Sequence, residues 1–215
     1  IPGDLRIGTG DELVYFEKPF IDMTGAYKCI TGFQLKKGSD PYTVDTENAE
    51  TGAIAFRYAE ALLNYAEAKA ELGELTQEDV DKTINLLRQR VGMADLKIDA
   101  IVKDPNWQFP EISPLLNEIR RERTVELACE GFRYDDIMRW RAHSLLKGKR
   151  PKGYPIKLSE WSNTINYKTD ENGFLDPYVD QIPNGYGFNP ERDYLECLPI
   201  NELTLNPNLN QNPNW

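Results

Sequence analysis

The chain has 215 residues, of which 40% are hydrophobic, so it is long enough to bury one sizeable core. Its formal net charge of −10 argues against binding to nucleic acids and against adsorption to an anionic membrane surface, because both need a basic surface. No apolar run approaches the roughly 20 residues that span a bilayer.

The first segment, residues 1–53, is predicted to be irregular. Turn-forming residues surround its one candidate strand, Thr24–Phe33, and the sequence KKGSDP follows that strand. The chain begins with Ile1 rather than Met, so we expect additional sequence upstream of it.

A helical hairpin is predicted for residues 54–92. In its first helix, Ile54–Leu72, apolar residues recur with the helical period, and we expect this apolar arc to face the core. Glu67 is expected on the opposite, polar side, and a third side lined by alanines lets a second helix approach closely. The arc consists of Ile54, Tyr58, Ala61, Leu62, Tyr65, Ala68 and Leu72, and the alanines are Ala59, Ala66 and Ala70.

Glycines and a capping motif mark the ends of the two hairpin helices. Gly73 is placed to stop the first helix, since glycine readily adopts the left-handed conformation of a C-terminal cap. Thr76 and Asp79 form a start that resembles a capping box, with Asp in place of the usual Glu. The second helix ends at Gly92 and carries Val80, Ile84, Leu87 and Val91 at core spacing.

Two further helices are predicted within residues 113–146. Ser113 is a suitable N-cap, and Pro114 fits the first helical position. This helix runs to the region of Glu130, where Gly131 interrupts it, and a shorter helix follows from Tyr134 to Ser144.

The remaining residues, 147–215, are predicted to form loops and an Asn- and Pro-rich tail packed on the helices. The aliphatic residues of the tail suggest that it is held to the body of the protein; they are Leu198, Ile200, Leu203, Leu205 and Leu209. We therefore expect residues 1–215 to form one mainly α-helical domain with long irregular loops.

Charged residues fall within the apolar arc of the third predicted helix, which Leu116, Ile119 and Leu127 define. Arg123 and Glu130 lie in the middle of this arc, and Glu126 lies at its edge. A buried charge must be paired, because desolvating a lone ion costs several kcal/mol. We expect Arg123 to pair with Glu126 along the helix, and Gly131 to turn the chain so that two charged segments face each other. The predicted structural ion-pair network comprises Arg123, Glu126, Glu130, Arg133, Asp136 and Arg139.

The same carboxylates have an alternative interpretation as a catalytic pair for glycoside hydrolysis. We disfavour it, because each carboxylate has an arginine neighbour, whereas a general acid needs a raised pKa. No catalytic residue is therefore assigned.

Nothing in the sequence predicts a metal site, a cofactor or a disulfide. The three cysteines, Cys29, Cys129 and Cys197, are widely spaced, and His143 has no Cys or His neighbour. The stretch DENGFLD, Asp170–Asp176, superficially resembles a calcium loop, but Gln181 stands where the closing Glu belongs, so we predict a turn.

Three blocks of the chain resemble the SusD/RagB family. They are RYAEALLNYAEAKAELG (Arg57–Gly73), IRRERTVELACEGFRYDDIMRW (Ile119–Trp140) and LPINELTLNPNLNQNPNW (Leu198–Trp215), and they occur in the order typical of the family. The second block carries an Arg-x-x-Glu-Leu-x-x-Glu-Gly-x-Arg-x-x-Asp-x-x-Arg-Trp array. Asp135 departs from the pattern, since many relatives carry an aromatic residue there.

This resemblance implies a fold of tetratricopeptide-like helix pairs with long loops around them. It also implies a glycan-binding protein that is lipid-anchored on the outer face of the outer membrane and works with a SusC-like, TonB-dependent transporter without cleaving the glycan. The chain resembles the C-terminal part of a family member, so the resemblance leaves open whether the sugar site lies in this chain or upstream of it.

Exposed aromatic rings in loops are the candidates for sugar binding, because sugars present flat apolar faces to proteins. The candidate residues are Trp107, Trp161, Tyr178, Tyr186 and Phe188. Each of them is also interpretable as a loop anchor that covers the core. Trp140 and Trp215 lie in family motifs and are assigned to packing.

The leading functional hypothesis is therefore glycan binding for nutrient uptake. The second is a scaffold in which the tetratricopeptide-like helix pairs hold the transporter or another protein, with no sugar site in this chain. A hydrolase is ranked last.

Overall fold

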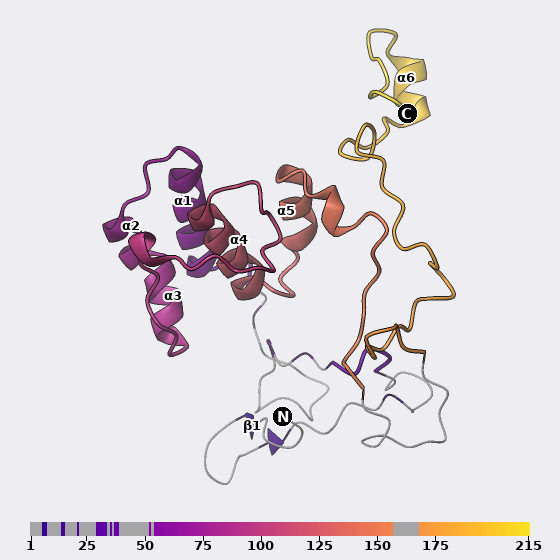
Figure 1. Ribbon diagram of the computed structural model, residues 1–215. Helices are drawn as coiled ribbons and strands as arrows, with labels where there is room; N and C mark the ends of the chain where they lie inside the picture. Colours follow the sequence, from indigo (N-terminus) through magenta and orange to yellow (C-terminus); the bar gives the residue numbers. More distant parts are fainter. Residues whose placement is uncertain are drawn as a thin grey trace. The chain divides into compact units, whose positions relative to one another are not determined.

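The computed structural model describes residues 54–156 and 168–215, together with residues 6–7, 14–15, 21, 29–33, 35, 37–38 and 52. This part of the protein is mainly helical, as the sequence predicts (Figure 1). The chain divides into two compact units, which are described separately below. We call Gly52–Trp140 the helical unit, and Ile1–Thr51 with Arg141–Trp215 the loop unit.

The helical unit is built from short helices joined by turns. Its α-helices are α1 (Tyr58–Glu71), α2 (Gln77–Lys82), α3 (Ile84–Arg90), α4 (Pro114–Glu126) and α5 (Arg133–Arg139), and its 3-10 helix is η2 (Ile98–Ala100). Helix α1 contacts α2, α3 and α4, so it is the central helix of this unit (Figure 1).

Glycine stops end α1 and α3, as predicted. Gly73 takes a φ of 71°, and the next amide, of Glu74, donates to the Lys69 carbonyl at 2.9 Å. Gly92 repeats this arrangement with the same φ, and the Met93 amide donates to the Arg88 carbonyl at 2.9 Å. Both ends are Schellman caps, which satisfy carbonyl groups that the helix itself leaves unbonded.

The predicted capping box at Thr76 and Asp79 is confirmed, with both reciprocal hydrogen bonds present. The helix that follows is broken, however, where a continuous one was predicted. Thr83 lies outside the helical region, with φ −125° and ψ −85°, and its hydroxyl donates to the Asp79 carbonyl at 2.7 Å. This local side-chain bond competes with the helical ladder and separates α2 from α3.

Helix α4 starts as predicted and ends early. The Ser113 side chain accepts a hydrogen bond from the Leu116 amide at 3.2 Å, and Pro114 occupies the first turn. The helix ends at Glu126 rather than near Glu130, and Cys129 adopts a φ of 63° before Gly131 adopts 89°. Two left-handed residues therefore form the turn for which glycine alone was predicted.

The second of these helices also ends early. Helix α5 stops at Arg139, whereas the prediction extended to Ser144. Arg141 takes a φ of 50°, which ends the helical path, and the 3-10 helix η3 (His143–Leu145) follows it in the loop unit.

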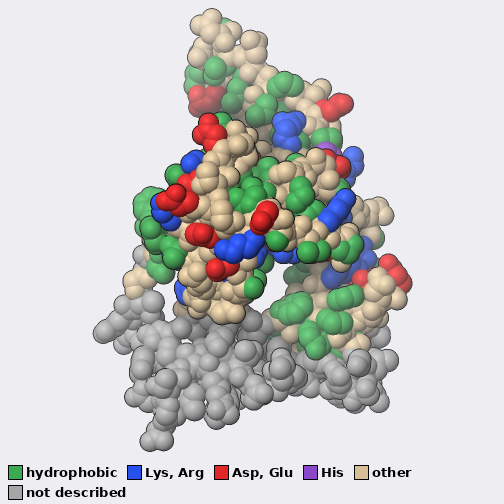
Figure 2. Space-filling model, turned by 60° about the vertical axis from the view of Figure 1, so that its left-hand side comes forward, with side chains coloured by type: hydrophobic (Ala, Val, Ile, Leu, Met, Phe, Trp, Pro, Cys, Tyr) green, Lys and Arg blue, Asp and Glu red, His purple; other side chains and the backbone are tan. Residues whose placement is uncertain are grey.

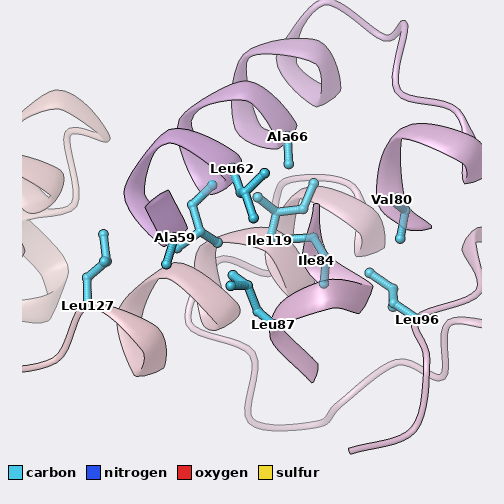
Figure 3. Close-up of a cluster of buried hydrophobic side chains, with 10 residues drawn as sticks. Ala59, Leu62, Ala66, Val80, Ile84, Leu87, Leu96, Ile119 and Leu127 are labelled. Carbon is cyan, nitrogen blue, oxygen red and sulfur yellow. The ribbon is translucent and has the colours of Figure 1, made fainter. Parts of the chain in front are cut away.

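The core of the helical unit uses only part of the predicted apolar arc of α1, since Leu62 of that arc is buried. Tyr58 and Leu72 are 73% and 71% exposed, whereas Leu63 and Ala66 are fully buried. Figure 3 shows Ala59, Leu62 and Ala66 of α1 in one cluster with side chains of α3 and α4. The small alanine side chains let these helices approach α1 closely, so the buried face of α1 combines Ala59 and Ala66 with two leucines. The buried cluster comprises Ala59, Leu62, Leu63, Ala66, Val80, Ile84, Leu87, Leu96, Ile119 and Leu127.

The loop unit contains little regular structure among its described residues. Its elements are the antiparallel pair β1 (Arg6–Ile7) and β2 (Val14–Tyr15), η3, and α6 (Ile200–Leu205). Ile21, Ile156 and Leu175 form its small buried cluster. The first half of the strand expected at Thr24–Phe33 lies outside the described residues, and Cys29–Phe33 form a turn closed by the Gly32 amide and the Cys29 carbonyl.

The tail is closed on itself by side-chain amides. The Gln211 side chain exchanges hydrogen bonds of 2.8 and 3.0 Å with the backbone N–H and C=O of Leu198. Asn212 donates to the Glu196 carbonyl, and the Trp215 indole donates to the Leu195 carbonyl. The tail aliphatics are less buried than expected, with Ile200 and Leu205 77% and 79% exposed.

Two leucines of α1 and its cap test the identity of the buried face. We expect Leu63→Ala to lower the free energy of unfolding by about 2–5 kcal/mol, because it leaves a cavity at a fully buried position. Leu72→Ala is the matched control and should change it by less than about 0.5 kcal/mol. Urea denaturation of both variants measures the difference, and equal losses would contradict the assigned core.

Candidate functional site

A cluster of paired charges lies inside the helical unit, with Arg123 of α4 at its centre. Arg123 is 5% exposed, and its Nε donates to both oxygens of Asp136 in α5, at 2.9 and 2.8 Å. Its Nη1 donates to Asn64 of α1 at 2.6 Å. One buried guanidinium therefore joins three helices.

Glu67 of α1 is a second member of this cluster and was expected on the polar side of the helix. It is 3% exposed and accepts hydrogen bonds of 2.8 and 2.6 Å from the two Nη atoms of Arg139. The Trp140 indole N–H also donates to Glu67. Arg139 completes the cluster by donating from Nε to Asp136 at 2.9 Å.

Arg57 holds the two other predicted carboxylates. It donates to both oxygens of Glu130, at 2.9 and 2.7 Å, and to Glu126 at 2.6 Å. The expected pair between Arg123 and Glu126 does not form, since Glu126 pairs with Arg57 and Arg90 instead. The partners of Glu126 therefore come from other parts of the fold and not from α4.

The sequence reasoning missed Arg57, Asn64 and Glu67 as members of this cluster. A signal for Glu67 was present: it stands four residues after Leu63, which places it on the same helical face as the buried Ala59. Arg57 precedes α1 and has no comparable periodicity.

Arg133 differs from the other arginines of the predicted network. Its Nη atoms donate to the Thr124 hydroxyl at 2.9 Å and to the Gln108 side-chain oxygen at 3.1 Å. Neither acceptor carries a charge. The structure therefore places all six predicted residues in the helical unit but gives one of them neutral partners.

Trp107, one of the predicted sugar-binding aromatics, lies among charged and polar side chains. It is half-buried, and its indole N–H donates to Glu118 at 3.1 Å. Glu118 is 4% exposed and also pairs with Arg121 and Arg88. Arg121 in turn pairs with Asp104 at 3.1 Å. The ring is therefore fixed by a hydrogen-bonded chain of charges.

A cavity of about 180 Å³ lies beside this ring, which we call the Trp107 cavity. It combines aromatic rings with amide, carboxylate and hydroxyl groups, which are the group types that bind sugars. Pockets that enclose drug-sized ligands measure roughly 300–1,000 Å³, so this cavity has room for a part of a ligand such as one ring. Its lining residues are Asp104, Asn106, Trp107, Gln108, Phe109, Asn117, Arg121, Thr124 and Val125.

Three other predicted aromatics lie in the loop unit and are not gathered into one site. Phe188 stacks on His143 with 6.0 Å between ring centroids, and it meets Tyr194 edge to face at 5.0 Å. Tyr186 is 43% exposed, and its amide donates to the Lys149 carbonyl, while Tyr178 is half-buried. The fifth candidate, Trp161, lies outside the described residues.

The predicted turn at Asp170–Asp176 is present, since Asp170 Oδ1 accepts hydrogen bonds from the Asn172 and Phe174 amides. Asp176, at the end of this segment, is 2% exposed. Hydrogen bonds from Arg150 and then from Lys152 lower the pKa of Asp176 to about 2, against the opposing effect of burial.

The described residues contain no group of three or more His, Cys, Asp or Glu side chains placed to share a metal ion. Of the helices in the described part of the chain, none is both long and apolar enough to cross a membrane.

Comparison with known proteins identifies the class of protein that this fold and these motifs define. The model of the SusD family matches residues 24–215, so the chain belongs to the SusD family. Members of this family are glycan-binding proteins of nutrient uptake rather than enzymes, and they are generally outer-membrane lipoproteins that associate with SusC-like transporters.

Two solved structures are similar to this chain: BT4246, a SusD-like protein from Bacteroides, and its selenomethionine form. Each is 28% identical, with a TM-score of 0.64 over 94% of this chain. The chain spans about a third of their length, 32% of BT4246 and 34% of the selenomethionine form. A comparison with curated proteins finds no match.

The buried cluster leads to a stability prediction. We expect Arg123→Ala to lower the free energy of unfolding by about 3–5 kcal/mol, because it leaves Asp136 buried with one fewer cation. Arg90→Ala is the matched control: Arg90 is 58% exposed, and its pair with Glu126 should contribute less than about 1 kcal/mol. Urea denaturation measures both, and an unchanged stability for Arg123→Ala would contradict a structural role.

Asp176 leads to a pH prediction. Its pKa is lower in the folded protein than the unfolded value of about 3.9, so its contribution to stability is complete above pH 3.9 and is lost as the pH falls through about 2. We expect Asp176→Asn to be less stable than wild type at pH 7, and the difference to shrink between about pH 4 and about pH 2. Asp180→Asn, at an exposed partner of Lys168, is the control. Denaturation across this pH range decides the point, and a constant difference would disprove the assignment.

Proposed function

We propose that the protein binds a glycan during nutrient uptake, together with a SusC-like, TonB-dependent outer-membrane transporter. The observation that carries this proposal is the match of the SusD family over residues 24–215. We also propose that a lipid anchor, attached upstream of this sequence, holds the protein on the outer face of the outer membrane.

The Trp107 cavity is the proposed sugar-binding site in this chain. The Trp107 ring is half-buried, and its N–H is bonded to Glu118, so the ring is oriented before a ligand arrives. Fixing a binding group in advance reduces the entropy lost on association. The Asn106 and Gln108 side chains are exposed beside the ring and suit the hydroxyl groups at the rim of a sugar.

The buried cluster around Arg123 is proposed to be structural rather than catalytic. Asp136 accepts from Arg123 and Arg139, and Glu130 accepts from Arg57 through both oxygens. Carboxylates held in this way are occupied by guanidinium groups and offer little to a substrate. This arrangement supports a binding protein that leaves its glycan intact.

A pair of Trp107 variants tests the sugar site. We expect Trp107→Ala to weaken glycan binding by roughly tenfold or more, because stacking on the ring is lost. Trp107→Phe removes the N–H donated to Glu118 but keeps a flat ring, so it should retain most of the affinity. Retardation of the intact protein in polysaccharide gels provides the measurement, and melting temperatures identify any loss of folding.

Trp215→Ala is the matched control, since this exposed tryptophan packs on Arg192 within the tail. Equal weakening by Trp107→Ala and Trp215→Ala would contradict the assignment of the site to Trp107. A protein that binds no glycan in a broad panel would support the scaffold hypothesis instead. Release of reducing sugar from any glycan would favour a hydrolase.

A further inference from the structure

A second cavity lies close to the Trp107 cavity and has a different electrostatic character. Its volume is about 230 Å³, and we call it the Arg133 cavity. Its charged lining residues are Arg123, Arg133 and Asp136, two cations and one anion. Both oxygens of Asp136 accept hydrogen bonds from Arg123, and Arg139 donates to one of them as well. Among the described residues, the guanidinium of Arg133 has no ion-pair partner at this cavity; it lies 5.9 Å from the centroid of the Trp140 ring.

The environment of Arg133 supports this assignment. Among the described residues, no carboxylate oxygen lies within ion-pair distance of its guanidinium, and its hydrogen-bond partners are the neutral Thr124 and Gln108. Burial lowers the pKa of Arg133 from its usual value, and the charge of Asp136 opposes this effect only in part. Placing a cation in such a site is costly unless an anion joins it. A guanidinium fork that is partly desolvated favours a carboxylate, which it binds through two parallel hydrogen bonds.

The two cavities share a wall. Thr124 lines both of them, and Gln108, the other acceptor of Arg133, lines the Trp107 cavity. The guanidinium that bonds to both residues therefore lies between the two cavities. One ligand that stacks on Trp107 can bring a substituent of the same sugar, or of its neighbour, to Arg133.

The charge on the rest of the surface limits what this ligand can be. In Figure 2 the basic and acidic side chains of the described surface lie interspersed, without a broad basic patch in that view. The chain also carries a net charge of −10, which repels a dense polyanion. These features fit a ligand whose negative charges are few and widely spaced, so that one arginine can neutralise the charge at the site.

We propose that Arg133 forms a subsite for the carboxylate of an acidic sugar, so that the protein selects a glycan carrying isolated uronic acid groups among neutral sugars. This inference rests on the proposed function and names its substrate class. Arg133 is the specificity-determining residue of the subsite, and the Trp107 ring binds the sugar face.

The test compares acidic glycans with their uncharged counterparts. Gel retardation of the intact protein is measured on a panel that includes glucuronoxylan, other polymers with uronate side groups, and the carboxyl-reduced form of each. We expect at least one acidic polymer to bind, and its reduced form to bind about tenfold more weakly, because a charge-assisted bidentate bond is lost.

The Arg133→Gln variant should weaken binding of the acidic polymer to the level of its reduced form and leave binding of the reduced form unchanged. A merely structural role would weaken both equally, so the acidic-to-reduced ratio separates the two roles even if the variant is less stable. Arg90→Gln removes one exposed positive charge from the same unit and should leave the ratio unchanged.

The outcomes distinguish this inference from the proposed function. If polymers bind equally well before and after carboxyl reduction, or if Arg133→Gln leaves the ratio unchanged, the carboxylate subsite is disproved and glycan binding stands. If the protein binds none of the polymers, acidic or neutral, both the subsite and the proposed function fail.

Discussion

The bond from Arg123 to Asp136 is the contact on which the helical unit depends. It joins α4 to α5 across the left-handed turn at Cys129 and Gly131, and Asn64 extends it to α1. A buried guanidinium is tolerated only when it is paired. Helices α1 and α5 must therefore place Asn64 and Asp136 within hydrogen-bond distance of Arg123. Apolar packing of α1 against α3 and α4 supplies the bulk of the burial, whereas this cluster specifies which faces meet.

Both cavities are built on the same helix. Arg121 and Thr124 project from α4 into the Trp107 cavity, and Arg123 and Thr124 line the Arg133 cavity. The ion pairs that hold α4 in place therefore also set the shape of the proposed binding surface. A ligand that bridges the two cavities would contact α4, and the buried ion pair between Arg123 and Asp136 fixes the position of this helix.

Local features were predictable from the sequence, whereas the partners of charged residues were not. The stops at Gly73 and Gly92 and the capping box at Thr76 depend on neighbours within a few residues, so a short window is sufficient to recognise them. The buried face of α1 was predicted only in part: Leu62 and the alanine side are buried as expected, whereas Tyr58 and Leu72 of the expected arc are exposed. The partners of Arg123 lie on α1 and α5, and no spacing along α4 reveals them.

The candidate site shows the same division. An aromatic in the loop before α4 was recognisable as a candidate sugar platform, but its anchoring to Glu118 required the fold. Phe188 was proposed on equal grounds, yet it packs against His143 and Tyr194. The neutral hydrogen-bond partners of Arg133 were hidden as well, because the sequence places Asp135 and Asp136 two and three residues after it. Proximity in the chain suggests that Arg133 pairs with Asp136, but Asp136 pairs with Arg123 and Arg139 instead.

Glu67 of α1 acts only as a hydrogen-bond acceptor, so its two partners must both be donors. It accepts from Arg139 and also from the indole N–H of Trp140, and an indole nitrogen has no lone pair to offer in return. In an isolated ion pair, the acid and the base could exchange positions without loss. Here the exchange would place an arginine at position 67, where its N–H groups would face the indole N–H of Trp140 and neither group could accept a hydrogen bond. Substitutions at positions 67, 139 and 140 are therefore coupled: position 67 of α1 must keep an acidic residue as long as position 140 is a tryptophan.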